Sequence, residues 1–260
     1  MVKAVKATIV FHWGYSIKHP MYSASQPALK FPPPTTLIGA LSYPYTRVNG
    51  QEVKSVGGQL YSSSITVLDH VLWACYKIVN VDPRILVETR DIVKVLIAPY
   101  VRSENVYPGS RFLWAIQVHG KICAPTLKLD TVFIVRDNSA KTVSRFAWGI
   151  ARVGSRESIV SVESVDVLDV EIEKSNVVST SFCFPKQLAQ NISGGYVEET
   201  LPALSREWFM LGTIRDVSTY MQAYVIPVEK VEVSLSPDAI ALHIKGLEPV
   251  IVPRGVIAHG

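Results

Sequence analysis

Three consecutive prolines, Pro32, Pro33 and Pro34, constrain this chain more than any other feature of its sequence. Each proline fixes its own φ and lacks a backbone N–H, so the segment must be extended and without ladder hydrogen bonds. The sequence that follows, TTLIGAL, has the apolar character of a buried helix. Proline is well tolerated at the start of a helix, where the N–H groups have no helical partner. The stretch therefore predicts a stiff turn that leads into a helix over residues 35–43.

Three positions in and after this helix carry specific expectations. The hydroxyl of Thr35 or Thr36 is expected to cap the helix. Pro44 is expected to end or kink it after Tyr43. Gly39 costs about 1 kcal/mol relative to alanine inside a helix, and we expect the close approach of another backbone to compensate for that cost.

Length and composition indicate a globular protein. The chain has 260 residues, of which 48% are apolar and 18% charged, enough to bury a sizeable core. No stretch approaches the ~18 consecutive apolar residues of a membrane-spanning helix. The net charge of +4 and the pI near 8.9 permit an anionic partner. The widely spaced Cys75, Cys123 and Cys183 predict buried free thiols, with no metal site and no cofactor.

Runs rich in β-branched residues predict that strands dominate the fold. Strands are expected at residues 3–13, 71–81, 111–118, 128–135, 157–173, 222–235 and 239–252. Helices are expected at 35–43 and at 139–154, the second ending at Gly154, and residues 61–71 are a further helix candidate.

This order of elements predicts the fold class. Over residues 3–167 it reads strand, helix, strand, strand, helix, strand, which is the ferredoxin-like or RRM-like pattern. We therefore expect an α+β protein with a ferredoxin-like domain at 1–168, interrupted by an insertion at about 82–120. A smaller β-rich C-terminal domain is expected at 169–260.

Two segments carry a resemblance to a known family. FPPPTTLIGAL, residues 31–41, resembles the signature of the CRISPR-associated RAMP proteins of the Cas-five family, in which a strand leads to a proline-rich turn, a Thr-Thr pair and a helix with a central glycine. WGIARVGSRESIVSV, residues 148–162, resembles the family's glycine turn between the second helix and the final strand. The length of the chain and the sequences of these two segments are most similar to the archaeal type I-A branch of the family.

The resemblance implies a function and a set of partners. It implies a non-catalytic, RNA-binding subunit of a type I-A Cascade interference complex, which caps the 5′ handle of the crRNA in antiviral defence. The implied partners are the crRNA handle and the RAMP backbone subunits, with the large subunit and target DNA reached indirectly. A cytoplasmic location without membrane contact follows from the same resemblance.

Single-stranded RNA needs cations for its phosphates and flat surfaces for its bases. HWGYSIKHPMYS, residues 12–23, interleaves both kinds of side chain in an expected loop. The alternative is that Trp13 and Tyr15 complete the first strand and lie in the core. The candidate RNA-binding residues before the helix and at its start are Lys18, His19, Tyr22, Ser23, Lys30, Thr35 and Thr36.

A second candidate site is the sequence ARVGSRES, residues 151–158, with Arg152, Ser155 and Arg156 around Gly154. A glycine in the left-handed region lets consecutive N–H groups face an anion, and arginine binds phosphate with two parallel donors. The alternative is an ordinary helix C-cap with exposed arginines.

An enzymatic alternative is a metal-independent endoribonuclease that processes CRISPR repeat RNA. One branch of the family, type I-C, cuts its repeat RNA with a Tyr, Lys and His set, and Tyr45, His119 and Lys121 supply these residue types here. His119 and Lys121 would share one face of a strand, but their spacing is not distinctive. A free-standing RRM-like RNA-binding protein is less well supported, because the usual RRM strand signature is absent.

Overall fold

The structure is a computed structural model that describes residues 2–22, 26–50, 53–96, 114–211 and 216–258. It is a mixed α/β fold rich in sheet, built around one antiparallel sheet with the strand order β17-β16-β9-β1-β8-β5. These strands are β1 (Val2–Phe11), β5 (Val71–Ile78), β8 (Lys128–Arg136), β9 (Val160–Ile172), β16 (Ala239–Ile244) and β17 (Val250–Pro253).

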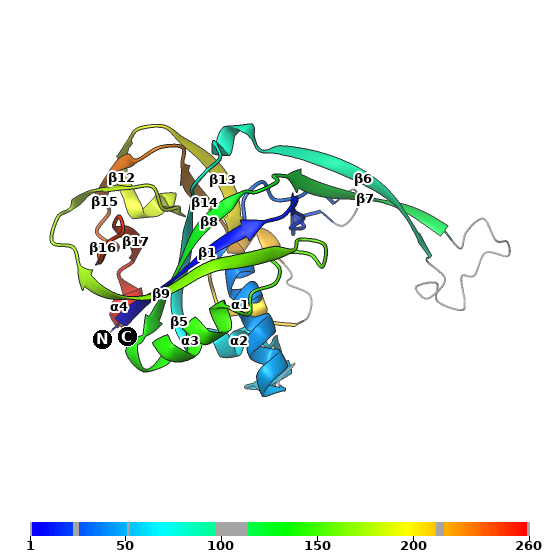
Figure 1. The fold of residues 1–260 in the computed structure, drawn as a ribbon, viewed down its shortest axis with the longest axis horizontal. Coiled ribbons are helices and arrows are strands. Elements are labelled where there is room, and N and C mark those ends of the chain that lie inside the picture. The colour runs from blue at the N-terminus through cyan, green and yellow to red at the C-terminus, as the bar shows by residue number, and fades with distance from the viewer. Residues whose placement is uncertain (1, 23–25, 51–52, 97–113, 212–215, 259–260) are drawn as a thin grey trace.

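Two helices pack on this sheet and on each other (Figure 1). α1 (Pro34–Asn49) lies between β1 and β5 in the chain, and α3 (Ala140–Ala147) lies between β8 and β9. The strand-helix-strand-strand-helix-strand order expected from the sequence is therefore present. The described residues also contain two α-helices of four residues, α2 (Ser64–Val67) and α4 (Gly255–Ala258).

Four smaller sheets flank the central one. Their strands are β10 (Val177–Thr180) with β15 (Val231–Leu235) and β12 (Ala189–Ser193); β11 (Phe184–Pro185) with β14 (Met221–Pro227) and β13 (Tyr196–Pro202); β2 (Gly14–Tyr15) with β7 (Trp114–Cys123) and β6 (Val87–Leu96); and β3 (Val53–Val56) with β4 (Gln59–Ser62). The expected strands at 71–81, 128–135, 157–173, 222–235 and 239–252 all correspond to strands in the structure.

β6 and β7 form a long antiparallel ribbon that extends away from the body of the molecule (Figure 1). It occupies the region expected as an insertion at about 82–120, and β7 continues to Cys123. Residues 111–113 of the expected strand at 111–118 lie outside the described residues. At its base the ribbon pairs with β2, through Gly14 opposite Cys123 and Tyr15 opposite Ile122.

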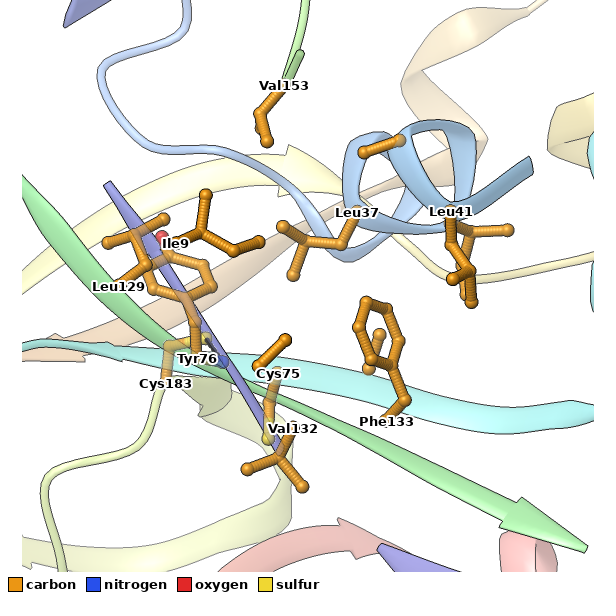
Figure 2. Close-up of a cluster of buried hydrophobic side chains, with 14 of the residues drawn as sticks. Ile9, Leu37, Leu41, Cys75, Tyr76, Leu129, Val132, Phe133, Val153 and Cys183 are labelled. Carbon is orange, nitrogen blue, oxygen red and sulfur yellow. Dashed lines mark hydrogen bonds between the residues drawn. The ribbon is translucent and has the colours of Figure 1, made fainter. Parts of the chain in front are cut away.

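One apolar core joins both halves of the sequence. Figure 2 shows Leu37 and Leu41 of α1 pointing towards Ile9 and Phe133 of the sheet. The same buried cluster includes Cys183 and other residues beyond 169. The boundary expected between residues 168 and 169 falls inside β9, and the C-terminal strands β16 and β17 extend the same sheet.

α1 differs from the expected helix at both ends. Its N-cap is Pro33, and no side chain caps it, because Pro34 is already the first helical residue and Thr35 is buried in the first turn. The expected cap by Thr35 or Thr36 was therefore wrong. The helix also continues past Pro44 to Asn49.

Tertiary packing explains why Pro44 does not end α1. A proline inside a helix costs about 3 kcal/mol through its missing hydrogen bond and its steric clash. Here the helix is packed on α3 beyond that point, with Tyr45 edge-on to Phe146 at 5.0 Å between ring centres. Gly149 leaves room for Pro44, since a Cβ at Gly149 would stand 2.6 Å from the Pro44 Cβ.

The other helix expectations need smaller corrections. α3 is shorter than the expected 139–154 and has Trp148 as its C-cap, so Gly154 lies in the loop beyond it. Only Ser64–Val67 of the 61–71 candidate is helical. Cys75 and Cys183 are buried free thiols as expected, whereas Cys123 is exposed at the end of β7. Among the described helices, none has the length and apolarity to cross a membrane.

Candidate nucleic-acid interface

A groove of about 480 Å³ separates the first half of α1 from the loop that follows α3. Thr36, Gly39 and Ala40 form the α1 side. The loop side is formed by residues 152–156, and residues 16–18 lie between the two sides.

A second hollow, of about 270 Å³, continues this groove towards the β6–β7 ribbon. The two hollows share Ser16, Lys18, Ser155 and Arg156, and the second adds His119, Lys121 and Glu157. We refer to the two together as the basic groove, which is lined by residues 16–18, 36, 39, 40, 119, 121, 152 and 154–157. It brings together segments that are far apart in the sequence.

The α1 side of the basic groove is lined by small residues. Apart from Gly39, its two chain neighbours and the backbone of its own helix within four residues, no described atom lies within 4 Å of the point where a Cβ on Gly39 would stand. The close approach of another backbone that we expected at Gly39 was therefore wrong for this chain itself. The missing side chain instead leaves open space in the groove, which a ligand can occupy.

The loop side depends on the left-handed conformation of Gly154, whose φ is +106°. A Cβ there would stand 2.8 Å from both the Ser16 carbonyl oxygen and Ile17 Cγ1, so only glycine lets the two segments meet. The Ser155 N–H donates to the Ser16 carbonyl over 2.9 Å, and the Ser16 N–H donates to Ser158 Oγ over 2.9 Å. The Ser155 N–H is therefore used within the chain and is not free to face an anion, contrary to expectation.

Three cations of the basic groove are available to an anionic ligand. In the part of the chain that the structure describes, Lys18, Arg152 and Arg156 have no carboxylate within ion-pair distance. The Arg152 guanidinium lies over the ring of Tyr43, 4.4 Å from its centre. Lys18 and the Arg152, Ser155 and Arg156 set, which were expected as parts of two separate candidate sites, thus line one groove.

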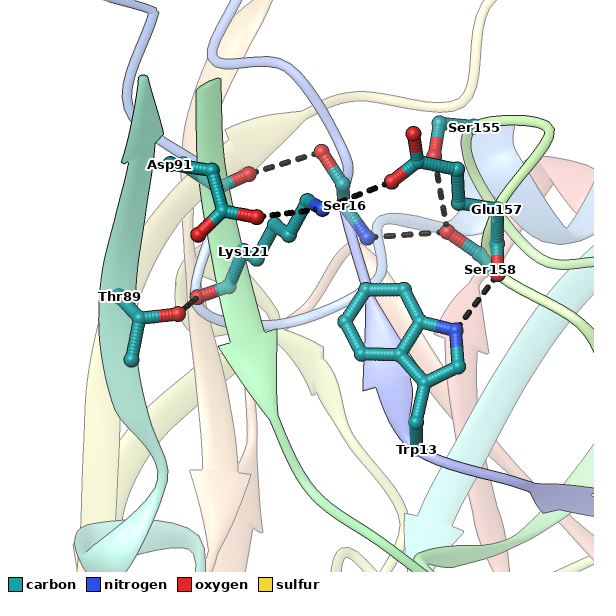
Figure 3. A network of polar contacts seen from close by, with 9 residues as sticks. Trp13, Ser16, Thr89, Asp91, Lys121, Ser155, Glu157 and Ser158 are labelled. Atoms are coloured by element: carbon teal, nitrogen blue, oxygen red, sulfur yellow. Dashed lines mark hydrogen bonds and ion pairs between the residues drawn. The ribbon is translucent and has the colours of Figure 1, made fainter. Parts of the chain in front are cut away.

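Lys121 is held differently. Its Nζ lies 2.6 Å from Asp91 Oδ2 and 2.9 Å from Glu157 Oε2, and the Trp13 ring lies 5.7 Å away (Figure 3). Hydrogen bonds to Asp91 and Glu157 raise the pKa of Lys121. Trp13 also donates its indole N–H to the Glu157 carbonyl over 2.6 Å. Lys121 is thus a protonated structural cation, a state that does not suit a general base.

Other candidates of the loop after β1 lie outside the groove lining. His19 and Tyr22 contact each other edge-on, 4.8 Å between ring centres, and Tyr22 is exposed. Burial lowers the pKa of His19. Ser23 lies outside the described residues. Tyr15 is buried in the core, as the alternative interpretation expected.

Lys30 and the catalytic candidates are also dispersed. The Lys30 ammonium is 3.4 Å from the Arg84 carbonyl and lies near the Phe31 ring, away from the groove. Tyr45 packs against Phe146 and His70 in the second half of α1, whereas His119 and Lys121 line the groove.

Sequence reasoning missed the residues that build the ribbon end of the groove. Ser16 donates its hydroxyl to the Gly120 carbonyl over 2.8 Å, and a Cβ on Gly120 would stand 2.2 Å from the Ala28 backbone nitrogen. Asp91 and Glu157 had no role assigned. The one available signal was Gly120 itself, a glycine inside a strand, which often marks close backbone approach.

Comparison with known proteins finds curated relatives of this chain, although no family model matches it. It is 29% identical over 179 residues to "CRISPR system aCascade subunit Cas5 1" of Saccharolobus solfataricus, covering 69% of this chain and 70% of that protein. It is 30% identical over 167 residues to "CRISPR-associated protein Cas5 3" of the same organism, covering 62% and 64%.

A solved structure shares the fold. The crystal structure of a CRISPR protein from Archaeoglobus fulgidus superposes with a TM-score of 0.59 at 19% identity, covering 97% of this chain and all of that one. The likeness in fold thus extends over nearly the whole chain, beyond the part that the sequence relatives cover. The Cas5 names of these relatives, together with the CRISPR protein that shares the fold, support a Cas5 RAMP protein.

Proposed function

We propose that this chain is the Cas5 subunit of an archaeal type I-A Cascade, and that it binds and caps the 5′ handle of the crRNA in the basic groove without cutting RNA. The observation that carries the proposal is a set of three cations, Lys18, Arg152 and Arg156, that have no carboxylate partner among the described residues and lie opposite the small-residue side of α1.

The chemistry of the groove fits a single-stranded RNA backbone. An arginine guanidinium donates two parallel hydrogen bonds to a phosphate, and Arg152 is held in place over Tyr43. Exposed guanidinium planes and aromatic rings also stack on unpaired bases. Gly39 provides room for the ribose-phosphate chain to approach α1 closely.

The fold supports the assignment of an RRM-like module. The chain order of β1, α1, β5, β8, α3 and β9, with neighbours β9-β1-β8-β5, is consistent with a ferredoxin-like domain in residues 1–168. The basic groove then lies where α1 faces the loop between α3 and the last strand of that domain.

A non-catalytic role is supported by the dispersion of the catalytic candidates. A metal-free RNA cut needs a base near the 2′-OH and an acid or cation near the departing oxygen. Tyr45 is packed on Phe146, and Lys121 is neutralised by two carboxylates. We therefore propose no nuclease activity for this set.

The proposed partners follow from the relatives. A relative is named as an aCascade subunit, and we propose that this chain likewise contacts RAMP backbone subunits, with the large subunit and target DNA reached indirectly. The β6–β7 ribbon extends from the body and offers surface for such a neighbour (Figure 1).

The test is binding of fluorescent repeat-derived handle RNA over a series of salt concentrations. Wild-type affinity is expected to fall with salt, because each phosphate contact releases counterions. Arg152→Ala combined with Arg156→Ala is expected to weaken binding and to flatten the salt slope by about two. The control, Lys230→Ala, removes an exposed positive charge outside the groove and is expected to change little. Equal affinity and slope in the double variant and the wild type would remove the groove from the RNA site.

A further inference from the structure

We propose that Lys121 is a positioning residue that shields two carboxylates at the ribbon end of the basic groove and fixes the Gly154 loop against the ribbon. This inference rests on the proposed RNA-binding function and assigns to Lys121 a role other than contact with RNA.

The first observation is where the partners of Lys121 come from. Asp91 belongs to β6 and Lys121 to β7, whereas Glu157 belongs to the loop that carries Arg152 and Arg156 (Figure 3). Trp13, just after β1, covers Lys121 and holds the Glu157 backbone through its indole N–H. One ammonium group therefore joins the ribbon to the loop that presents the phosphate-binding arginines.

The second observation is the charge balance. Lys121 supplies one positive charge against two negative charges, and its side chain is 23% exposed, compared with 51% for Asp91 and 62% for Glu157. Glu157 adjoins Arg156 in the chain and lines the same hollow. Without Lys121, two mostly exposed carboxylates would border the path of the RNA and repel its phosphates.

The third observation is that the base of the ribbon has other attachments. The Gly120 N–H donates to the Gln26 carbonyl over 2.8 Å, and Ser16 donates its hydroxyl to the Gly120 carbonyl. The pairing of β2 with β7 adds further backbone contacts. A variant without the Lys121 charge is therefore expected to fold, so its effects on RNA binding can be measured.

Shielding and direct phosphate contact predict different results. If Lys121 shields the carboxylates, removal of both carboxylate charges restores binding to a Lys121 variant. If Lys121 contacts a phosphate, its loss persists whatever happens to Asp91 and Glu157. The decisive comparison is between Lys121→Met and the triple variant Lys121→Met, Asp91→Asn, Glu157→Gln.

The experiment measures affinity for handle RNA and its salt dependence in the wild type and four variants. Lys121→Met is expected to weaken binding about tenfold, and the triple variant to return to within about twofold of wild type. Asp91→Asn with Glu157→Gln alone is expected to tighten binding and to steepen the salt slope by about one, because the freed ammonium then meets a phosphate. Lys128→Met, which removes an ion pair with Glu163 outside the groove, is the matched control.

A second measurement does not depend on RNA. Amide hydrogen exchange of peptides covering residues 13–17 and 152–160 is expected to accelerate in Lys121→Met and to stay unchanged in Lys128→Met. A wild-type protein that does not bind RNA would refute the proposed function. The exchange data would still test whether Lys121 fixes the Gly154 loop against the ribbon. A triple variant as weak as Lys121→Met, or unchanged exchange in Lys121→Met, would overturn this inference.

Discussion

The guanidinium of Arg152 stacks on the ring of Tyr43, 4.4 Å from its centre, and so links the loop after α3 to helix α1 beside the basic groove. The contact restricts a long, flexible side chain that the sequence alone would leave free. An arginine held in this way loses less conformational entropy when it binds a phosphate.

The first prediction concerns this stack. Tyr43→Leu is expected to weaken the binding of handle RNA by about two- to fivefold, because an exposed cation–π contact contributes about 0.5–1 kcal/mol. Tyr43→Phe keeps the ring and is expected to bind like the wild type. Fluorescence anisotropy with one RNA at one salt concentration makes the comparison. Equal weakening by both substitutions would point to the tyrosine hydroxyl instead.

The second prediction concerns Gly39, where no described atom beyond its chain neighbours and its own helix backbone lies within 4 Å of the position that a side-chain methyl group would take. Gly39→Ala is expected to stabilise the protein by about 1 kcal/mol through helix propensity, which corresponds to a rise in Tm of about 2–4 °C. Gly39→Trp is expected to fold and to lose RNA affinity, because its ring fills the groove. Val48→Trp, on an exposed position of the same helix, is the control. A fall in Tm for Gly39→Ala would show a contact that the structure lacks.

The third prediction concerns Gly154. Gly154→Ala places a Cβ 2.8 Å from the Ser16 carbonyl at a φ of +106°, and such strain costs about 1–3 kcal/mol. Gly246→Ala is a matched control, because Gly246 has a φ of +80° with no atom within 4 Å of its Cβ position. Urea unfolding of both variants separates the cost of the backbone conformation from that of the close contact. Equal losses of stability would mean that the Ser16 contact contributes nothing.

The fourth prediction decides between capping and cleavage. Purified protein mixed with full-length repeat RNA is expected to leave it intact on a denaturing gel, with or without a chelator. His119→Ala is expected to leave crRNA length unchanged in an assembled complex. Cleavage at the base of the 5′ handle that survives chelation and disappears with His119→Ala would establish the endoribonuclease alternative, since a metal-free cut needs a proton-transfer residue.

The sequence predicted those elements whose cause is local. β8 is rich in apolar and β-branched residues and β9 has clear alternation, so both were found close to their observed bounds. The three prolines likewise dictated the turn before α1. The continuation of α1 past Pro44 was not predictable in this way, because it depends on Phe146 and Gly149, which are distant in the chain.

The same distinction holds for the candidate site. Arg152 and Arg156 were identified because a glycine between basic residues has a local meaning. Lys121 was identified by residue type, but its pairing with Glu157 joins two distant segments and no local pattern indicates it. Lys30 was assigned to the site by its nearness in sequence to the proline turn, but its ammonium lies 3.4 Å from the Arg84 carbonyl, outside the lining of the groove.

The short pairing of β9 with β16 has a consequence for biosynthesis. Residues 170–172 of β9 pair with residues 242–244 of β16. This end of β9 therefore has no β16 partner while the ribosome is still making the intervening segment. Unpaired strand edges are templates for wrong association between nascent chains. Chaperone contact during translation is thus expected to concentrate on β9, and ribosomes stalled before residue 239 should carry a chain that is more readily digested by protease than the released protein.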